Sequence, residues 1–128
     1  MPHIPGTTLH LPGDMFYAEP SQSVGHEQKG RRPYIIMSRK NANLQSVVAV
    51  PFTSDKDATQ VWPAYCIRLP ASQVVKDLSY TGEIVNSIAL CHQVRILDHS
   101  CLKQKIGKLT PTAVIAVQLG LSNLFDIR

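Results

Sequence analysis

The pattern of hydrophobic positions along the chain changes several times, and each change marks an element. Short runs rich in β-branched and aromatic residues, bounded by Pro, Gly, Asn or Ser, predict a succession of strands. The run 83–98 is longer and more mixed, with a break near His92, and predicts two strands or one bent strand. The other strands are expected at 14–19, 34–38, 46–54, 64–69 and 104–110.

Helical spacing dominates the last part of the chain. Thr110 can cap a helix, and Pro111 suits the first helical position because its missing N–H has no partner there anyway. A second, short helix is expected within 70–82. The apolar residues that follow Pro111 recur at helical spacing and predict an amphipathic helix packed on the sheet, with a stripe of Val114, Val117, Leu121, Leu124 and Phe125.

These elements predict a mainly β (α+β) fold, a small barrel or curled sheet of mostly antiparallel strands with one covering helix. The 128 residues suit a single domain, 1–128, because no repeat or change of composition divides them. Residues 1–12 combine prolines and glycines without a regular period and predict a flexible arm.

Composition narrows the environment and the partners. Hydrophobic residues make up 44% of the chain, which is ordinary for a folded domain, and the net charge of +4 favours phosphate-bearing or acidic partners. Three scattered cysteines, Cys66, Cys91 and Cys101, suit a reducing cytosol better than a disulfide framework. Without a secretory signal or a membrane-length apolar run, we expect a soluble cytoplasmic protein.

A long polar loop before the strand at 34–38 concentrates the candidate chemistry. It carries a histidine, a glutamate, a glutamine and several cations, while the chain has no phosphate-cradling glycine loop and no nucleophile elbow. The nearest approach to a metal cluster, Cys91 and His92 with His99 and Cys101, lacks paired ligand spacing. Such an inventory suits RNA cleavage by attack of the 2′-OH, which needs a base, an acid and cations but no metal or enzyme nucleophile.

Four blocks in register then carry a resemblance. Residues 13–14, 25–33, 47–54 and 92–98 read GD, GHEQKGRRP, VVAVPFTS and HQVRILD, and together they resemble the MazF/PemK (Kid) family of toxins from type II toxin–antitoxin modules. The resemblance implies an SH3-like barrel with a C-terminal helix. It also implies a homodimeric, metal-independent endoribonuclease that cuts single-stranded RNA, chiefly mRNA, and leaves 2′,3′-cyclic phosphate and 5′-OH ends.

The resemblance also implies partners. A cognate antitoxin would block the RNA groove, and operator DNA would be bound only through the toxin–antitoxin complex. No cofactor and no membrane contact are implied.

The family pattern assigns roles by position. Arg32 and Thr53 match catalytic positions of MazF-type members, for stabilising the phosphorane and holding the phosphate, and His26 matches the loop histidine of the Kid-type branch. The residues expected to contact RNA are Glu27, Gln28, Lys29, Arg31, Ser54 and Gln93.

One departure from the family changes the expected mechanism. Kid-type members use an arginine and an aspartate just before the glutamine, and this chain has Leu90 and His92 there. Either Arg32 and Thr53 carry the catalysis, or His92 replaces the aspartate as base and forms an acid and base pair with His26, since imidazoles titrate near neutral pH.

Alternative interpretations remain open at this level. His26 could fix only a turn, His92 could be a core histidine, and Trp62 or Tyr65 could either stack on a base or be buried. The chain could also be a gyrase-binding toxin of the same fold without nuclease activity, or an inactive relative that acts as an antitoxin-binding, autorepressing subunit.

Overall fold

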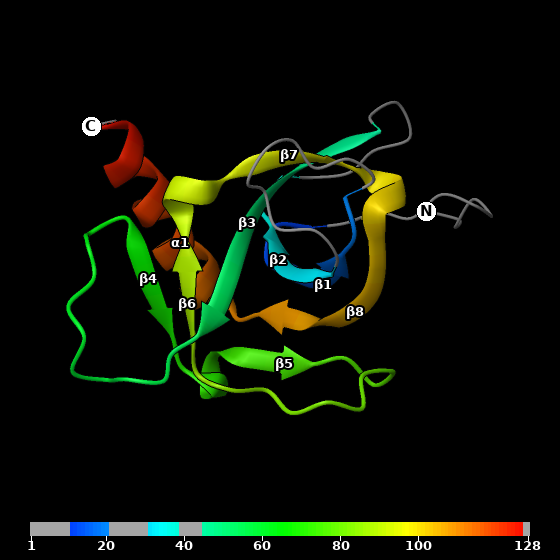
Figure 1. Ribbon diagram of the computed structural model, residues 1–128, viewed down its shortest axis with the longest axis horizontal. Helices are drawn as coiled ribbons and strands as arrows, with labels where there is room; N and C mark the ends of the chain where they lie inside the picture. Colours follow the sequence, from blue (N-terminus) through cyan, green and yellow to red (C-terminus); the bar gives the residue numbers. More distant parts are fainter. Residues whose placement is uncertain (1–10, 21–30, 39–44, 127–128) are drawn as a thin grey trace.

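The computed structural model describes residues 11–20, 31–38 and 45–126 of the chain (Figure 1). The strands in this part are β1 (Asp14–Ala18), β2 (Arg32–Ile36), β3 (Ser46–Ser54), β4 (Cys66–Leu69), β5 (Val74–Lys76), β6 (Ser87–Leu90), β7 (Arg95–Asp98) and β8 (Leu102–Leu109). Three 3-10 turns, η1 (Ala71–Gln73), η2 (Cys91–Gln93) and η3 (His99–Cys101), connect some of them, and the helix α1 (Pro111–Phe125) follows β8.

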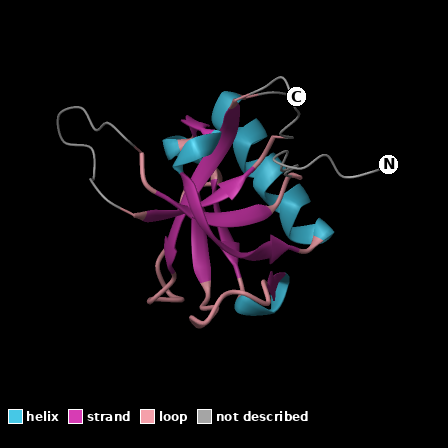
Figure 2. Cartoon of the chain, turned by 90° about the vertical axis from the view of Figure 1, so that its right-hand side faces the viewer, coloured by secondary structure: helices cyan, strands magenta, loops and turns pink. Residues whose placement is uncertain are grey.

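The strands form a strongly curled sheet in which every pairing is antiparallel. Its order is β4-β6-β3-β2-β1-β8-β5, and β7 pairs with β3 beside this path. The helix α1 lies along one side of the strands (Figure 2). The expected mainly β fold with a C-terminal helix is therefore confirmed.

Strand β3 changes partner along its length, and this change creates the turn that carries two candidate site residues. Its first half pairs with β7 up to Ala49, and its last residues pair with β6 from Phe52 onward. Pro51 lies in the gap between these two ladders and is paired with neither β7 nor β6. Its missing N–H therefore removes no hydrogen bond from either ladder. The turn η2 joins β6 to β7 across this gap.

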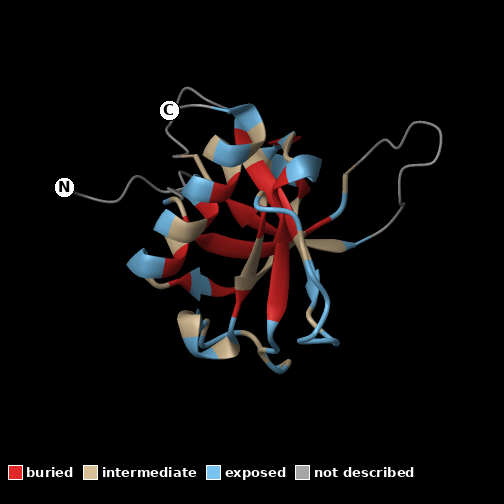
Figure 3. Ribbon diagram, turned by 90° about the vertical axis from the view of Figure 1, so that its left-hand side faces the viewer, coloured by how far each residue is buried: buried red, intermediate tan, exposed pale blue. Residues whose placement is uncertain are grey.

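The core fills the inside of the curl and the inner face of α1, where the buried residues lie (Figure 3). Its central cluster joins Met15, Ile35 and Val50 of the sheet to Val117 of the helix, all at most 2% exposed. Phe125 is 59% exposed, so it does not pack on the sheet with the stripe as expected. It is the last residue of α1, directly before the left-handed C-cap residue Asp126.

Gly120 sets how closely α1 approaches η2. A Cβ atom at this position would lie 2.7 Å from Cγ1 of Ile67 and 2.9 Å from Sγ of Cys91, closer than real Cβ atoms come. The glycine therefore lets the helix rest directly on Cys91, the buried residue of η2.

Gly13 explains the start of the GD block. Its φ of +103° lies in the region that side chains disfavour, which only glycine adopts readily. In this conformation the Gly13 N–H donates to the carbonyl oxygen of Ile36, and the Gly13 carbonyl accepts from the N–H of Leu109. The block thus ties the beginning of β1 to β2 and β8.

Several expected elements differ from the structure in their bounds: β8 begins two residues before the expected strand, and β6 begins four residues after the start of the run 83–98. β2 begins at Arg32, two residues before the expected strand, because β1 supplies partners for Arg32 and Pro33. The expected helix within 70–82 is only the turn η1, and it is followed by β5, where Val74 pairs with Leu109 of β8. No helix in the described part of the chain is long and apolar enough to cross a membrane.

Candidate active site

Arg32 and Thr53 lie at the same end of two paired strands. Tyr34 of β2 is opposite Pro51 of β3, and each of the two candidates lies two positions beyond that pair on its own strand. The Arg32 guanidinium carbon is 6.0 Å from the centre of the buried Tyr34 ring, a cation–π contact that holds the side chain over the core. Thr53 is exposed, so its hydroxyl is open to a ligand.

His92 and Gln93 come from η2 and are both exposed, because the single turn has only Cys91 pointing inward. The N–H of Val94 closes the turn on the carbonyl of Cys91. The buried Cys91, packed under Gly120, therefore anchors a short segment that presents two polar side chains to solvent.

A chain of polar contacts joins these residues. The Arg32 guanidinium donates to the Gln93 side-chain oxygen at 3.3 Å, and the Gln93 amide nitrogen lies 3.4 Å from Nε2 of His92. On its other side, Nδ1 of His92 lies 3.6 Å from Sγ of Cys66. The two contacts of Gln93 are long for hydrogen bonds and lie at the exposed surface, so they orient the groups more than they stabilise the fold.

The direction of the first contact in this chain is fixed by the arginine. Arginine can only donate, so the Gln93 oxygen accepts and its NH2 group faces His92. The two ring nitrogens of His92 thus have one polar neighbour each, Gln93 at Nε2 and Cys66 at Nδ1, and the tautomer sets which nitrogen donates.

Packing also holds the imidazole. The Tyr65 ring lies 5.4 Å from it between centroids, with 59° between the planes. Trp62 and Tyr65 both pack against the cluster of Cys66, Ile88 and Leu90, and the indole nitrogen of Trp62 is buried without a hydrogen-bond partner among the described residues. Trp62 is therefore a packing residue in this structure, and Tyr65 contacts the site through His92.

The nearby thiols are not poised as nucleophiles. Burial raises the pKa of Cys66, and it raises the pKa of Cys91 to about 11, with a smaller contribution from Cys66. Both thiols therefore stay protonated at neutral pH, and a thiolate is the form that attacks or binds metal. Within the described ranges, no group of three or more His, Cys, Asp and Glu side chains is placed to hold a metal ion.

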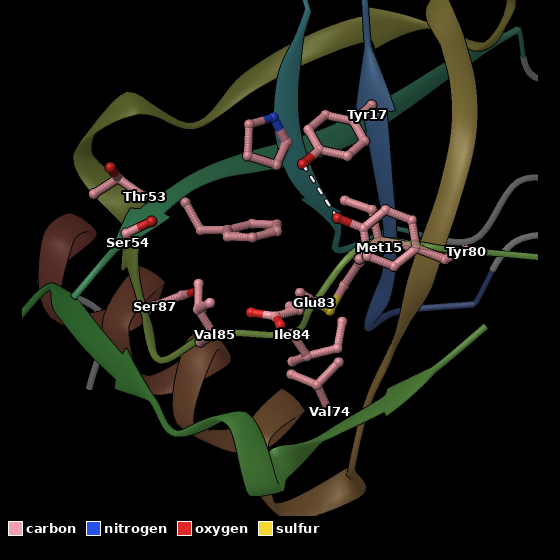
Figure 4. Close-up of a pocket in the computed structure, with 13 residues that line it drawn as sticks. Met15, Tyr17, Thr53, Ser54, Val74, Tyr80, Glu83, Ile84, Val85 and Ser87 are labelled. Carbon is pink, nitrogen blue, oxygen red and sulfur yellow. Dashed lines mark hydrogen bonds between the residues drawn. The ribbon is translucent and has the colours of Figure 1, made fainter. Parts of the chain in front are cut away.

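The other expected contact residues divide into three sets. Ser54 is exposed beside Thr53, and both residues line a pocket between β1, the end of β3 and the loop that precedes β6 (Figure 4). Arg31 is engaged by Glu19, with Nε 3.2 Å from the carboxylate oxygen and both side chains about half exposed. Glu27, Gln28 and Lys29, together with the catalytic candidate His26, lie outside the described residues.

The structure thus brings together Arg32, Gln93 and His92, and places Thr53 at the same end of the β2–β3 pair. Sequence reasoning missed Cys66 as a contact of His92, and it missed the pocket side chains of Tyr17, Tyr80 and Glu83. Cys66 follows Tyr65 in an alternating strand, which gave no signal that its sulfur faces a polar side chain.

Comparison with known proteins agrees with this geometry. The family model for the PemK-like, MazF-like toxin of type II toxin–antitoxin systems matches residues 11–125. The chain belongs to this family, as its four sequence blocks predicted.

Individual relatives support the same assignment. An endoribonuclease MazF of Staphylococcus epidermidis is 30% identical over 122 residues, which cover 89% of this chain and 93% of the relative. The fold is similar to that of a MazE–MazF structure from Deinococcus radiodurans, with a TM-score of 0.66, 18% identity and coverage of 95% and 100% of the two chains. It is also similar to a mycobacterial endoribonuclease in complex with its cognate antitoxin, with a TM-score of 0.64, 17% identity and coverage of 93% and 97%.

Proposed function

We propose that this chain is the toxin of a toxin–antitoxin module and an endoribonuclease that cuts single-stranded RNA, chiefly mRNA, without a metal ion. The observation that carries the proposal is the polar chain from Arg32 through Gln93 to His92, at the strand end that also bears Thr53. The name of the Staphylococcus epidermidis relative, endoribonuclease MazF, supports the same activity.

The proposed reaction begins at the 2′-OH of the RNA. Its proton moves to Nε2 of His92, the 2′-oxygen forms a bond to phosphorus, and the bond from phosphorus to the 5′-oxygen breaks. The guanidinium of Arg32 offers paired donors to the charge that develops on the phosphorane, and the hydroxyl of Thr53 holds a phosphate oxygen. The leaving 5′-oxygen takes a proton from an acid, for which His26 is the candidate, and the products carry a 2′,3′-cyclic phosphate and a 5′-OH.

The proposal includes a homodimer and an antitoxin that covers the RNA-binding face. Related chains from Deinococcus radiodurans and from a mycobacterium occur in structures together with MazE or a cognate antitoxin. We propose that operator DNA is bound only through such a complex, and that the protein acts in the cytoplasm.

The test is to incubate the purified protein with mixed-sequence single-stranded RNA in EDTA and to analyse the new ends. Cleavage with 2′,3′-cyclic phosphate ends supports the proposal. Intact RNA together with inhibited gyrase supercoiling would instead support a gyrase-binding toxin, and neither effect would point to an inactive, antitoxin-binding relative.

The role of His92 has its own test. Because imidazoles ionise near neutrality, the log of the cleavage rate should rise with pH on the acidic side of the pH–rate profile. His92→Ala should remove this rise and most of the activity. Thr53→Val, which removes only the hydroxyl, should lower the rate without this change of profile. Full activity of His92→Ala would leave catalysis to Arg32 and Thr53.

A further inference from the structure

A pocket beside Thr53 has the kind of lining that small-molecule sites have (Figure 4). Thr53 is the one residue of the proposed reaction among its lining residues in the described part of the chain. The pocket encloses about 470 Å³, including its solvent-open mouth, between β1, the end of β3 and the loop that precedes β6. Phe52 and Pro33 contribute apolar surface, and Tyr17, Tyr80 and Glu83 contribute polar groups. Apolar side chains combined with a few polar groups are typical of ligand pockets.

The two tyrosines form one wall. Their ring centroids are 6.3 Å apart with 48° between the planes, and their hydroxyl oxygens are 3.5 Å apart. That separation exceeds an ordinary O–H···O hydrogen bond of about 2.5–3.0 Å, so a ligand atom can replace this contact at little cost. The Tyr17 hydroxyl, followed by burial, raises the pKa of Tyr80 to about 12, so the Tyr80 hydroxyl is protonated and can donate at neutral pH.

Glu83 forms the opposite side of the pocket. Its carboxylate is directed into the pocket (Figure 4), although the residue is exposed at the mouth. Within the described part of the chain, neither a hydrogen bond nor an ion pair engages this carboxylate. A free carboxylate can only accept, so it selects a ligand that presents N–H donors.

Cations lie beside the aromatic wall. The Arg31 guanidinium carbon is 6.0 Å from the Tyr17 ring centre, and Nζ of Lys76 is 5.8 Å from the Tyr80 ring centre. Arg31 also pairs with Glu19, which leaves its remaining donors for a phosphate. Aromatic rings flanked by cations are the combination that binds single-stranded nucleic acid, with bases on the rings and phosphates on the cations.

We propose that this pocket is a subsite for one nucleobase of single-stranded RNA next to the phosphate held at Thr53, and that Glu83 makes it prefer bases with an exocyclic amino group. Adenine, cytosine and guanine each offer such a group to a carboxylate, whereas uracil has none, and its single N3–H donor lies between two carbonyl oxygens that a carboxylate repels. This subsite rests on the proposed function for its substrate, but its base preference can be measured by binding alone.

The test compares the binding of fluorescently labelled single-stranded oligo(A), oligo(C) and oligo(U) of equal length by anisotropy. The wild-type protein should bind oligo(A) or oligo(C) about tenfold more tightly than oligo(U), the size expected for one charge-assisted hydrogen bond. Glu83→Gln should bring this ratio close to one, because an amide can donate to uracil as well as accept. Tyr80→Ala should weaken the binding of all three RNAs.

A matched control separates the pocket from net charge. Asp98→Asn removes the same charge from an exposed carboxylate at the end of β7, where it accepts from the N–H and hydroxyl of Ser100 outside the pocket, and it should leave the ratio unchanged. Equal wild-type affinity for the three RNAs, or a ratio that Glu83→Gln does not alter, would overturn the subsite even if the protein cleaves RNA. Conversely, a ratio lost in Glu83→Gln without RNA cleavage would support the subsite and refute the endoribonuclease.

Discussion

The guanidinium of Arg32 donates to the side-chain oxygen of Gln93 across 3.3 Å, although the two residues lie 61 positions apart in the chain. The first begins β2, and the second ends the turn that crosses the gap in the β3 ladders. The contact joins the part of the site that stabilises charge to the part that carries the imidazole.

Cutting this contact should lower activity without unfolding the protein. Gln93→Met keeps the length of the side chain but removes both its acceptor for Arg32 and its donor for His92, so RNA cleavage should fall by about 10- to 100-fold, as for a lost positioning contact. Since Gln93 is exposed, the melting temperature should change little. Initial cleavage rates and thermal melts of the same preparations check this, and cleavage at the wild-type rate would contradict it.

Replacing Arg32 by lysine should be more damaging than its retained charge suggests. A lysine loses the planar fork that can face two phosphate oxygens, and it loses the stacking on Tyr34. We expect cleavage to fall by about 10²–10³-fold, as when one stabilising donor of a developing anion is removed.

Arg31→Lys provides the matched comparison, because it makes the same exchange at the neighbouring residue, which contacts Glu19 and the Tyr17 ring rather than Gln93. Its effect on the cleavage rate should be smaller than that of Arg32→Lys. Equal losses in the two variants would show that the charge of the segment, rather than the Arg32 fork, supports activity.

Gly120→Ala should destabilise the protein despite the better helix propensity of alanine, which is worth about 1 kcal/mol. The new methyl group would overlap Ile67 and Cys91, and overpacking of a core costs about 1–3 kcal/mol. Because the overlap pushes on η2, cleavage should fall together with the melting temperature.

The control for this helix substitution is Gln118→Ala, two positions earlier on an exposed face. It gains the same kind of helix propensity without a clash and should melt at or slightly above the wild-type temperature. A Gly120→Ala variant that is more stable than the wild type would show that the helix can move away from η2 freely.

The buried thiol of Cys91 predicts a dependence of stability on alkaline pH. Burial raises its pKa from the usual 9.0 to about 11, so the folded state holds this proton more tightly than the unfolded chain does. The resulting stabilisation is complete below the unfolded pKa and is lost as the pH rises through about 11.

The measurement compares the wild type with Cys91→Ala, which lacks the ionising group. Between neutral and strongly alkaline pH, the wild type should lose more of its free energy of unfolding than the variant does, since lysine and tyrosine titration is common to both. Parallel losses in the two proteins would show that the thiol contributes nothing to this dependence.

Much of the fold followed from local patterns. The run 46–54 is a strand over its whole length because its β-branched residues have no competing helical period, and the pair Thr110 and Pro111 starts α1 where capping chemistry places it. The region after Leu69 was mispredicted as a helix, because Val74 and Val75 become a strand only when β8 offers its edge.

The site divides in the same way. The sequence by itself determined the family and the residue types available for catalysis, since the blocks around Arg32, Thr53 and His92 are contiguous in the chain and their chemistry is local. Only the tertiary structure decided that Gln93 lies between Arg32 and His92, that Cys66 contacts the imidazole, and that Glu83 faces the tyrosines beside Thr53. These contacts depend on where β3 changes partner and on how closely α1 approaches η2 at Gly120. Both features are set by register and packing between segments that are distant in the chain. Such long-range relationships leave no period or spacing in the sequence.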